Sequence, residues 1–243
     1  TMLFAGITGN LIAGFLPKFL VSYGMSDNNG LKYAIFVHLF AAVLSSIFYS
    51  RLSIVRLNDA EKNNPIGLKT SKKLLLYLVL PPMTVGLGAG MTIPFLNLYF
   101  KNQFNLESQM IGIIFASAQA LTVLGALLGP LLAKKYGLIK TVIITQIISI
   151  PFLYILGFTY FFPAVLSAFL IRNALMNMSG PLSSNFAMEV VSPEDRPITS
   201  GLLSVAWLAT WGLTANIGGM LIEKYGYQIP FACTIFFYII SSL

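Results

Sequence analysis

Hydrophobic residues along the chain gather into eight long stretches that are separated by short polar segments. Each stretch is about 20 residues long, the length of helix that spans the hydrocarbon core of a bilayer. The stretches cover residues 2–23, 31–50, 74–100, 109–133, 141–159, 162–188, 199–222 and 227–243. A soluble protein of 243 residues has no core large enough to bury so much continuous apolar helix. The pattern therefore predicts an all-α polytopic membrane protein with about eight transmembrane helices.

Charged residues are scarce and unevenly placed. They make up 9% of the chain, against about 25% in a typical soluble domain. If the spans alternate in direction, ten of the fifteen lysines and arginines fall on one side of the membrane. These ten are Arg51, Arg56, Lys62, Lys69, Lys72, Lys73, Lys134, Lys135, Lys140 and Arg196. The positive-inside rule then places these loops and both chain ends in the cytoplasm. We expect the membrane to be the plasma membrane. The rule also accounts for the net charge of +7 without a nucleic-acid partner.

Few residues of this chain carry catalytic or metal-binding chemistry. Cys233 is the single cysteine and His38 the single histidine, which excludes a disulfide framework and a histidine-rich metal site. The sequence shows no nucleophile–base set and no phosphate-binding loop. We therefore expect neither an enzyme nor a bound cofactor or metal.

A short internal repeat indicates how the spans are organised. Gly14 and Leu16 in the first span correspond to Gly219 and Leu221 in the seventh, and each copy leads to a Tyr-Gly pair. Because six spans separate the copies, the simplest unit is a bundle of six helices, as in transporters with two parallel halves. Chance similarity between two glycine-rich helix ends is the alternative.

The repeat predicts a division of the chain into three parts. Residues 1–50 are the last two helices of an amino-terminal bundle, residues 51–73 a cytoplasmic loop between bundles, and residues 74–243 a carboxyl-terminal six-helix bundle. An ordinary cytoplasmic loop is the competing interpretation of residues 51–73. On this division the sequence is a fragment that lacks four helices before Thr1 and the end of its last helix.

Two G-x-x-x-G pairs predict where helices pack closely. Gly86 pairs with Gly90, and Gly125 pairs with Gly129. Small residues let helix backbones approach each other, which is how helices associate in lipid. Static packing is favoured over a moving hinge at each of these glycines.

Four segments carry motifs of a known transporter family. Residues 129–137 (GPLLAKKYG) are similar to a cytoplasmic loop of pattern G-x-L-A-D-R-x-G, although Pro130 and Lys134 replace a glycine and the acidic residue. Residues 86–100 contain glycines and a proline, similar to a glycine-rich helix of that family that is broken by proline. Residues 170–173 (LIRN) contain an arginine inside the membrane. Residues 193–201 follow the pattern P-x-x-R-x-x-x-x-G. By these segments the chain resembles the major facilitator superfamily over essentially its whole length.

The resemblance implies bundles of the major-facilitator type and secondary active or facilitative transport of a small solute by alternating access. The implied partners are the lipid bilayer and the solute, with a proton as a candidate coupling ion and a monomer as the oligomeric state. Two alternatives stay open, namely proton-coupled multidrug efflux and a non-transporting membrane sensor with the same fold.

Arg172 is the sharpest candidate for contact with a solute. If the sixth span begins near Phe162, Arg172 lies about 14 Å deep, close to the midplane of the membrane. A charged side chain there is costly and is by default a functional hypothesis, such as the attraction of an anionic solute. Pairing with a carboxylate on an absent helix and tethering to backbone carbonyls are the alternatives.

Further polar and aromatic side chains at membrane depth complete the predicted solute site. They are Asn173, Asn177, Gln119, Asn97, His38, Asn10, Trp207 and Trp211. An interhelical hydrogen bond is the alternative for each polar residue. The two tryptophans share one helix face away from its ends, so they form either an aromatic cavity wall or plain packing.

Charged residues after the fourth and sixth spans form a predicted cytoplasmic gate. They are Lys134, Lys135, Glu189, Glu194, Asp195 and Arg196. Salt bridges between the two loops would close the inner side of the bundle. The local alternative has Ser192 as N-cap, Pro193 at the first helical position and Asp195 in the first turn of the next helix.

Overall fold

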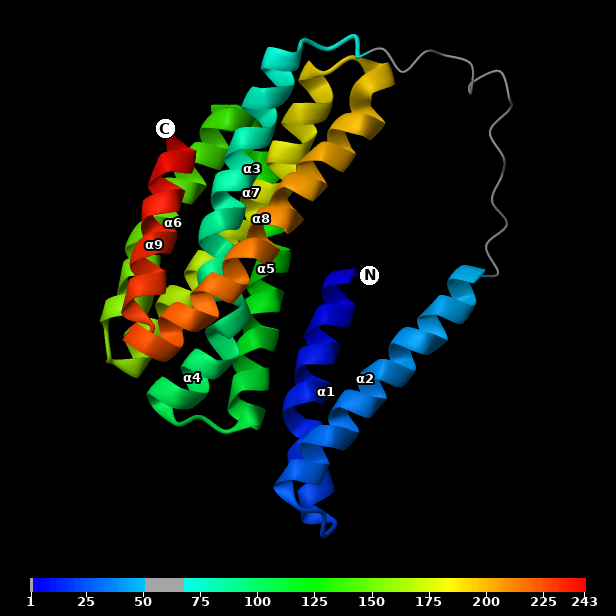
Figure 1. Cartoon of the computed structure of the whole chain (residues 1–243), viewed down its shortest axis with the longest axis vertical. Coiled ribbons are helices and arrows are strands. Elements are labelled where there is room, and N and C mark those ends of the chain that lie inside the picture. The colour runs from blue at the N-terminus through cyan, green and yellow to red at the C-terminus, as the bar shows by residue number, and fades with distance from the viewer. Residues whose placement is uncertain (1, 51–67) are drawn as a thin grey trace.

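The computed structural model of the chain describes residues 2–50 and 68–243. These residues form helices joined by short turns, and neither described range contains a strand (Figure 1). The helices are α1 (Met2–Ser22), α2 (Asp27–Ser50), α3 (Lys72–Thr92), η2 (Ile93–Phe95), α4 (Leu96–Phe104), α5 (Ser108–Tyr136), α6 (Leu138–Phe158), α7 (Phe162–Val190), η3 (Pro193–Asp195), α8 (Arg196–Tyr225) and α9 (Gln228–Ser242). The predicted all-α membrane fold is confirmed.

Proline and glycine set several helix boundaries. Pro94 divides the third predicted span, because it has no N–H to donate and lies in η2 between α3 and α4. α5 and α8 end at Gly137 (φ 87°) and Gly226 (φ 78°), in a conformation that glycine adopts without steric cost. The turns between helices are short, so the helices lie close to one another.

Five helical segments of the described ranges are long and apolar enough to cross a membrane. They are Ala5–Ser22, Lys72–Phe104, Ser108–Tyr136, Leu138–Phe158 and Pro193–Tyr225. The apolar parts of α2 and α9 are shorter. α7 is 29 residues long but is not one of the five, and its middle holds Arg172, Asn173 and Asn177. Since such residues are costly to expose to lipid, we expect their side of α7 to face other helices or a polar cavity.

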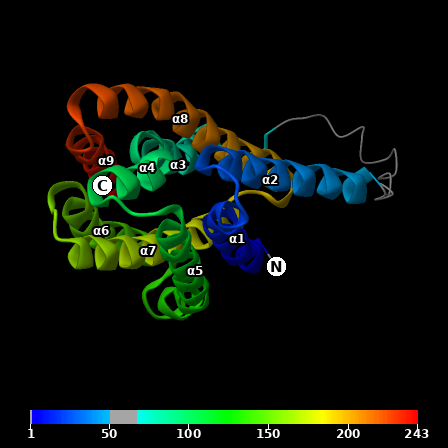
Figure 2. The same ribbon diagram turned by 90° about the horizontal axis from the view of Figure 1, so that it is seen from below.

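α1 and α2 form a hairpin that lies beside a bundle of the other helices (Figures 1 and 2). Within the bundle, α8 packs on α3, α7 packs on α5 and α6, and α9 packs on α3 and α6. Its core is rich in aromatic residues, and the rings of Phe100 and Phe169 meet edge to face with centroids 5.2 Å apart. α1 joins the bundle by packing on α5.

The predicted glycine pairs lie at helix contacts. A Cβ on Gly90 would overlap the Thr214 hydroxyl of α8, and one on Gly125 would lie 2.9 Å from the Ala174 carbonyl oxygen of α7. The other member of each pair meets the same neighbouring helix. Close helix packing at both pairs is confirmed, because an added Cβ would come closer than 3.0 Å to an atom of the partner helix at all four glycines.

The helices run between two ends of the molecule. The Lys18 end contains the α1–α2 and α4–α5 turns, and the Asp195 end contains the α7–α8 turn and the segment that leads into α3. Most of the predicted inter-bundle loop, residues 51–67 with Arg51, Arg56 and Lys62, lies outside the described residues. The division of the chain into two bundles stays a prediction.

Candidate functional site

Three amide side chains of the predicted site lie on α5 and α7. Asn173 donates from Nδ2 to the Ala118 carbonyl oxygen (3.1 Å) and to Thr122 Oγ1 (2.9 Å), both on α5. Asn177, one turn further along α7, donates from Nδ2 to the Asn173 carbonyl oxygen (2.8 Å) and is exposed. These contacts join the middle of α7 to the middle of α5, and they leave the carbonyl oxygen of the Asn177 side chain free of described partners.

Gln119 extends this group toward α1. A Cβ on Gly6 of α1 would lie 3.2 Å from Cδ of Gln119, so the two residues face each other across the helix contact. Since Gln119 follows Ala118 directly, neighbouring residues of α5 face α7 and α1. We call Gln119, Asn173 and Asn177 the amide cluster because they lie at one level of α5 and α7; no described hydrogen bond joins Gln119 to the two asparagines. Amide groups both donate and accept hydrogen bonds, so the cluster offers donors as well as acceptors to a solute.

Arg172 points to another part of the bundle. Its Nη2 donates to the Tyr238 hydroxyl of α9 (2.8 Å), and its guanidinium carbon lies 5.6 Å from the centre of the Tyr238 ring. The side chain is 3% exposed, and Nε has no hydrogen-bond partner among the described residues. Successive residues of a helix are about 100° apart, which is why Asn173 faces α5 while Arg172 faces α9. The structure does not bring Arg172 to the amide cluster, and contact with a solute stays a prediction for this residue.

The other predicted site residues are distributed over several helices. Asn97 is exposed on α4, and His38 is exposed on α2 with Nδ1 2.8 Å from the Ala34 carbonyl oxygen. Trp207 and Trp211 are half-buried and pack against the aromatic core. This arrangement corresponds to plain packing, the alternative to an aromatic cavity wall. No described hydrogen bond links these four side chains to the amide cluster.

Asn10 lies where α1 and α5 come closest. A Cβ on Gly112 of α5 would lie 2.8 Å from the Asn10 carbonyl oxygen and 2.7 Å from Cα of Gly14. A Cβ on Gly14 would likewise lie 2.8 Å from Cα of Gly112. One helical turn beyond this contact, Lys18 Nζ and Glu107 Oε2 are 2.9 Å apart at the exposed end of the interface. The backbones of the two helices therefore touch near the Lys18 end.

Lys18 alters the electrostatics of this end. Its hydrogen bond and its positive charge hold the pKa of the Glu107 carboxyl below the ordinary value of 4.5. Both side chains are largely exposed, at 62% for Lys18 and 73% for Glu107. Water and salt therefore screen the attraction, and the pair orients the two helices more than it stabilises them.

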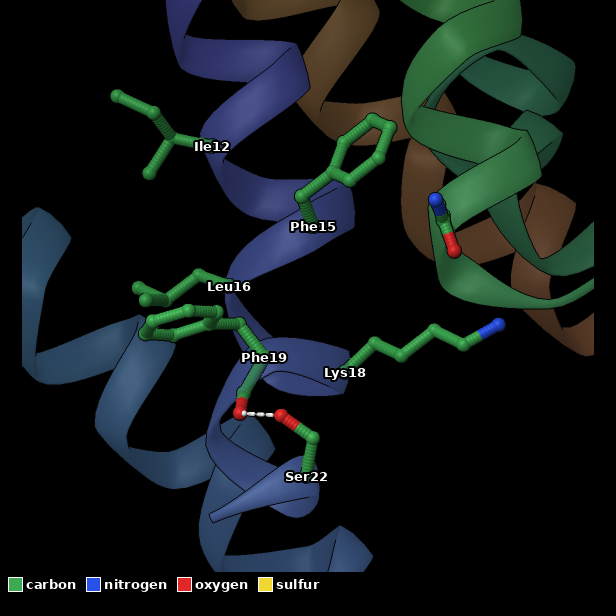
Figure 3. Close-up of a pocket in the computed structure, with 7 residues that line it drawn as sticks. Ile12, Phe15, Leu16, Lys18, Phe19 and Ser22 are labelled. Atoms are coloured by element: carbon green, nitrogen blue, oxygen red, sulfur yellow. Dashed lines mark hydrogen bonds between the residues drawn. The ribbon is translucent and has the colours of Figure 1, made fainter.

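A shallow groove of about 510 Å³ runs along α1 near the same end (Figure 3). It is lined by Ile12, Phe15, Leu16, Lys18, Phe19, Ser22 and Gln109. Figure 3 shows Lys18 pointing away from Leu16 and Phe19, and Ser22 donating to the Phe19 carbonyl oxygen. The walls are mostly apolar and contain no member of the amide cluster, so the groove is separate from the predicted solute site.

At the Asp195 end, the predicted gate residues form a different set of contacts. Glu194 pairs with Lys69, with Nζ and Oε1 2.9 Å apart, rather than with Lys134 or Lys135. The Lys69–Glu194 hydrogen bond and the charge of Glu194 raise the pKa of the Lys69 ammonium. Lys134 and Lys135 are exposed and pair with no described carboxylate, and Glu189 and Arg196 are exposed as well. The proposed salt bridges between the two loops are therefore not formed in this structure.

Asp195 is buried and binds a residue that the sequence did not single out. Its carboxylate accepts a hydrogen bond from the Thr70 backbone N–H, and the Ser192 N–H donates to Thr70 Oγ1 (3.1 Å). Pro193 begins η3 as the local alternative predicted, whereas Ser192 makes no side-chain capping bond. Thr70, which lies outside this turn, therefore makes the hydrogen bonds that hold the start of η3. No local signal marks Thr70, because its partners lie more than 100 positions away in the sequence.

Solved structures of low sequence identity share this fold. A bacterial homologue of the iron transporter ferroportin, in an inward-facing state, is 16% identical with a TM-score of 0.66, over 99% of this chain and 60% of that one. A bacterial homologue of the human lysosomal transporter Spinster, inward-facing and unoccupied, is 16% identical with a TM-score of 0.68, over 99% and 67%. A bacterial metal transporter is 12% identical with a TM-score of 0.61, over 99% and 83%. The chain therefore spans only 60% of the length of the ferroportin homologue.

Sequence comparison gives the family directly. A search of curated proteins found no match to the chain. Residues 82–243, more than half of the chain, match the sequence model of the Major Facilitator Superfamily. The match covers α4 to α9 and the second half of α3, and it includes all three residues of the amide cluster. A multi-pass membrane transporter fold, rather than an enzyme fold, follows from this match and from the three structures. The chain belongs to the major facilitator superfamily.

Proposed function

We propose that the chain is part of a secondary transporter that moves a small polar solute across the plasma membrane by alternating access. In this proposal α1 and α2 belong to one bundle and residues 74–243 to the other. The observation that carries it is the contact between α1 and α5, which is closed by paired glycines and an ion pair near one end of the molecule. Rocking of two bundles about a central site is how transporters with parallel repeats work.

The amide cluster lies between the α1–α5 glycine contact and the Asp195 end of the molecule. Gln119 follows Gly112 by about two helical turns, or about 10 Å, away from the Lys18 end. A solute bound at the cluster is thus separated from the Lys18 end by the point where the α1 and α5 backbones touch. We infer that this state opens toward the Asp195 end.

Two further observations support that orientation. The basic residues Lys69, Lys72, Lys134, Lys135 and Lys140 all lie at the Asp195 end, which the positive-inside rule assigns to the cytoplasm. The ferroportin and Spinster homologues are both recorded in inward-facing states. We therefore propose that this is an inward-facing state with the Asp195 end in the cytoplasm.

The test is solute flux through the full-length protein in vesicles. A panel of small polar solutes is first screened for those that raise the melting temperature, and flux of each such solute is then measured. We expect Asn177→Ala to lower that flux about tenfold, because Asn177 is the exposed member of the amide cluster. Asn102→Ala, which removes a hydrogen bond to Tyr227 at the Lys18 end, is the matched control and should keep wild-type flux.

Absence of flux for every solute that shifts the melting temperature would favour a membrane sensor. Flux that depends on a proton gradient and is confined to large apolar cations would favour multidrug efflux. Labelling of a cysteine at position 177, in a Cys233→Ser background, tests access separately. We expect a membrane-impermeant maleimide to react from the cytoplasmic side when the α1–α5 contact is closed.

A further inference from the structure

The turn between α5 and α6 presents three lysines within a short segment. Lys134 and Lys135 end α5, Lys140 lies in the first turn of α6, and all three are exposed. Gly137 makes this sharp turn possible, with φ 87° and an N–H that donates to the Ala133 carbonyl oxygen (2.8 Å). We call these three residues the lysine turn.

The lysine turn has no internal counter-charge. In residues 2–50 and 68–243, no ion pair joins any of its lysines to a carboxylate. Of the carboxylates at this end, Glu194 is paired with Lys69, Asp195 accepts from Thr70, and Glu189 is exposed and forms no described ion pair with the three lysines. Three positive charges are therefore available to a partner outside the described chain.

Exposed apolar side chains lie among these lysines. Leu131 is 65% exposed, and Tyr136 and Ile139 are each 47% exposed. The Lys135 ammonium lies 5.1 Å from the centre of the Tyr136 ring. Tyrosine at the end of a span and lysine with an extended stem are typical of the boundary between hydrocarbon and headgroups. The turn thus has the composition of a surface that lies at the level of lipid headgroups.

We propose that the lysine turn binds the headgroup of an anionic phospholipid in the cytoplasmic leaflet. The phosphate lies against the lysine ammonium groups, and the acyl chains lie along Leu131 and Ile139. A soluble anion uses only the lysines, whereas a lipid uses the lysines and the apolar side chains together. The choice of leaflet rests on the orientation given under Proposed function, while the choice of ligand rests on the turn alone.

The opposite end of the molecule offers a matched control. Lys224 lies 5.2 Å from the centre of the Tyr225 ring, nearly the same geometry as Lys135 with Tyr136. It is a single lysine, and Glu223 precedes it in the sequence. Lys224→Gln therefore removes a lysine from a lysine–tyrosine contact without removing a cluster of positive charge.

The experiment measures lipid binding by the full-length protein in neutral detergent, so no transport is needed. Dioctanoyl phosphatidylglycerol and dioctanoyl phosphatidylcholine are titrated separately, and the midpoint of the rise in melting temperature is recorded. We expect the wild type to prefer the anionic lipid. The preference should fall about fivefold for each lysine neutralised and roughly 100-fold for Lys134→Gln, Lys135→Gln and Lys140→Gln together. Lys224→Gln should keep the wild-type preference.

Three outcomes would overturn the proposal. They are equal binding of both lipids by the wild type, a triple variant that keeps the preference, and displacement of the lipid by millimolar inorganic phosphate, which would indicate a soluble-anion site. If the triple variant does not fold, the three single variants give the same answer through their separate losses. A loss of lipid preference with normal flux, or the reverse, distinguishes this proposal from the proposed transport function.

Discussion

Glycine brings two pairs of helices into backbone contact, α3 with α8 and α1 with α5, but the two interfaces are built differently. α3 and α8 run in parallel and touch at several levels, at Gly86, at Gly90 and where a Cβ on Gly218 would overlap the Met91 carbonyl. α1 and α5 run antiparallel, and glycine brings their backbones together where Gly14 faces Gly112. Both interfaces are extensive, but contacts of glycine with backbone recur along the first and gather around Gly14 and Gly112 in the second.

The two interfaces also differ in whether the polar contact at their end is buried or exposed. Near the start of α3 and α8, the Thr70 N–H donates to a buried carboxylate, that of Asp195. At the end of the α1–α5 interface, the ion pair of Lys18 and Glu107 is exposed. A buried, hydrogen-bonded charge holds its geometry, whereas an exposed pair can separate into water. In the proposed transport cycle we therefore expect the α3–α8 contact to stay fixed and the α1–α5 contact to open.

The largest effect is expected for Gly90→Ala. The new Cβ would overlap the Thr214 hydroxyl and the Trp211 carbonyl, and the backbone of α8 cannot give way without losing its other contacts with α3. We expect a loss of stability of about 3 kcal/mol, measured as thermal unfolding in detergent. Gly212→Ala on α8 has no heavy atom within 4 Å of the new Cβ and is the control. Equal melting temperatures for the two variants would remove the distinction between fixed and open contacts.

Gly112→Ala should leave the bundle folded but open the α1–α5 contact. The new Cβ meets the Gly14 Cα at 2.7 Å and the Asn10 carbonyl oxygen at 2.8 Å, and we expect α1 to move away from α5 while the rest of the bundle keeps its packing. Spin labels at the exposed positions Tyr23 and Lys101, in a Cys233→Ser background, should report a longer distance, and flux should fall about tenfold. Gly9→Ala on α1, which meets no atom within 4 Å, should match the wild type. A large loss of melting temperature in Gly112→Ala would instead make this contact part of the fixed core.

A smaller effect is expected at the Asp195 end. Asp195→Ala leaves the Thr70 N–H without its acceptor, and the melting temperature should fall by roughly 2–4 °C. Glu194→Ala removes the neighbouring carboxylate, whose partner Lys69 is exposed, and should change the melting temperature by less than about 1 °C. If the two variants behave alike, burial of Asp195 does not distinguish this end from the Lys18 end.

The smallest effect is expected for the Lys18–Glu107 pair, and it depends on pH. Because Lys18 lowers the pKa of Glu107, the pair contributes its full stabilisation above the ordinary glutamate pKa of 4.5. That contribution is lost as the pH falls through the lowered pKa of the folded state. The difference in spin-label distance between wild type and Glu107→Gln should therefore be present at pH 7, shrink as the pH falls below 4.5, and be reduced by high salt. A difference that does not change with pH or salt would mean that shape rather than charge closes this end.

Several features of the fold follow from local stretches of sequence. The hydrophobic pattern predicted the helices because hydropathy is a property of each window of about 20 residues, and Pro94 and Gly137 act on their own neighbours in the chain. The G-x-x-x-G pairs were visible because both glycines are in one helix. Gly112 was not singled out, since it forms no such pair and its partner Gly14 lies on another helix.

The candidate site shows the limit of the same reasoning. The sequence placed Arg172, Asn173 and Asn177 within the membrane, and in the structure the two asparagines are hydrogen-bonded to each other while Arg172 binds Tyr238. The predicted gate named Glu194 and Asp195, whose partners in this structure are Lys69 and Thr70, and its salt bridges to Lys134 and Lys135 stay a prediction.

The sequence by itself determined the class of protein, the positions of the long apolar helices and the family resemblance. Each of these depends on which residues lie within a short stretch of chain. Only the tertiary structure decided that Arg172 faces Tyr238, 66 positions away, and that Asp195 binds Thr70, 125 positions away. The reason is physical, since the rotation of a helix about its axis and the choice of partner are fixed by packing against distant segments, which no local pattern encodes.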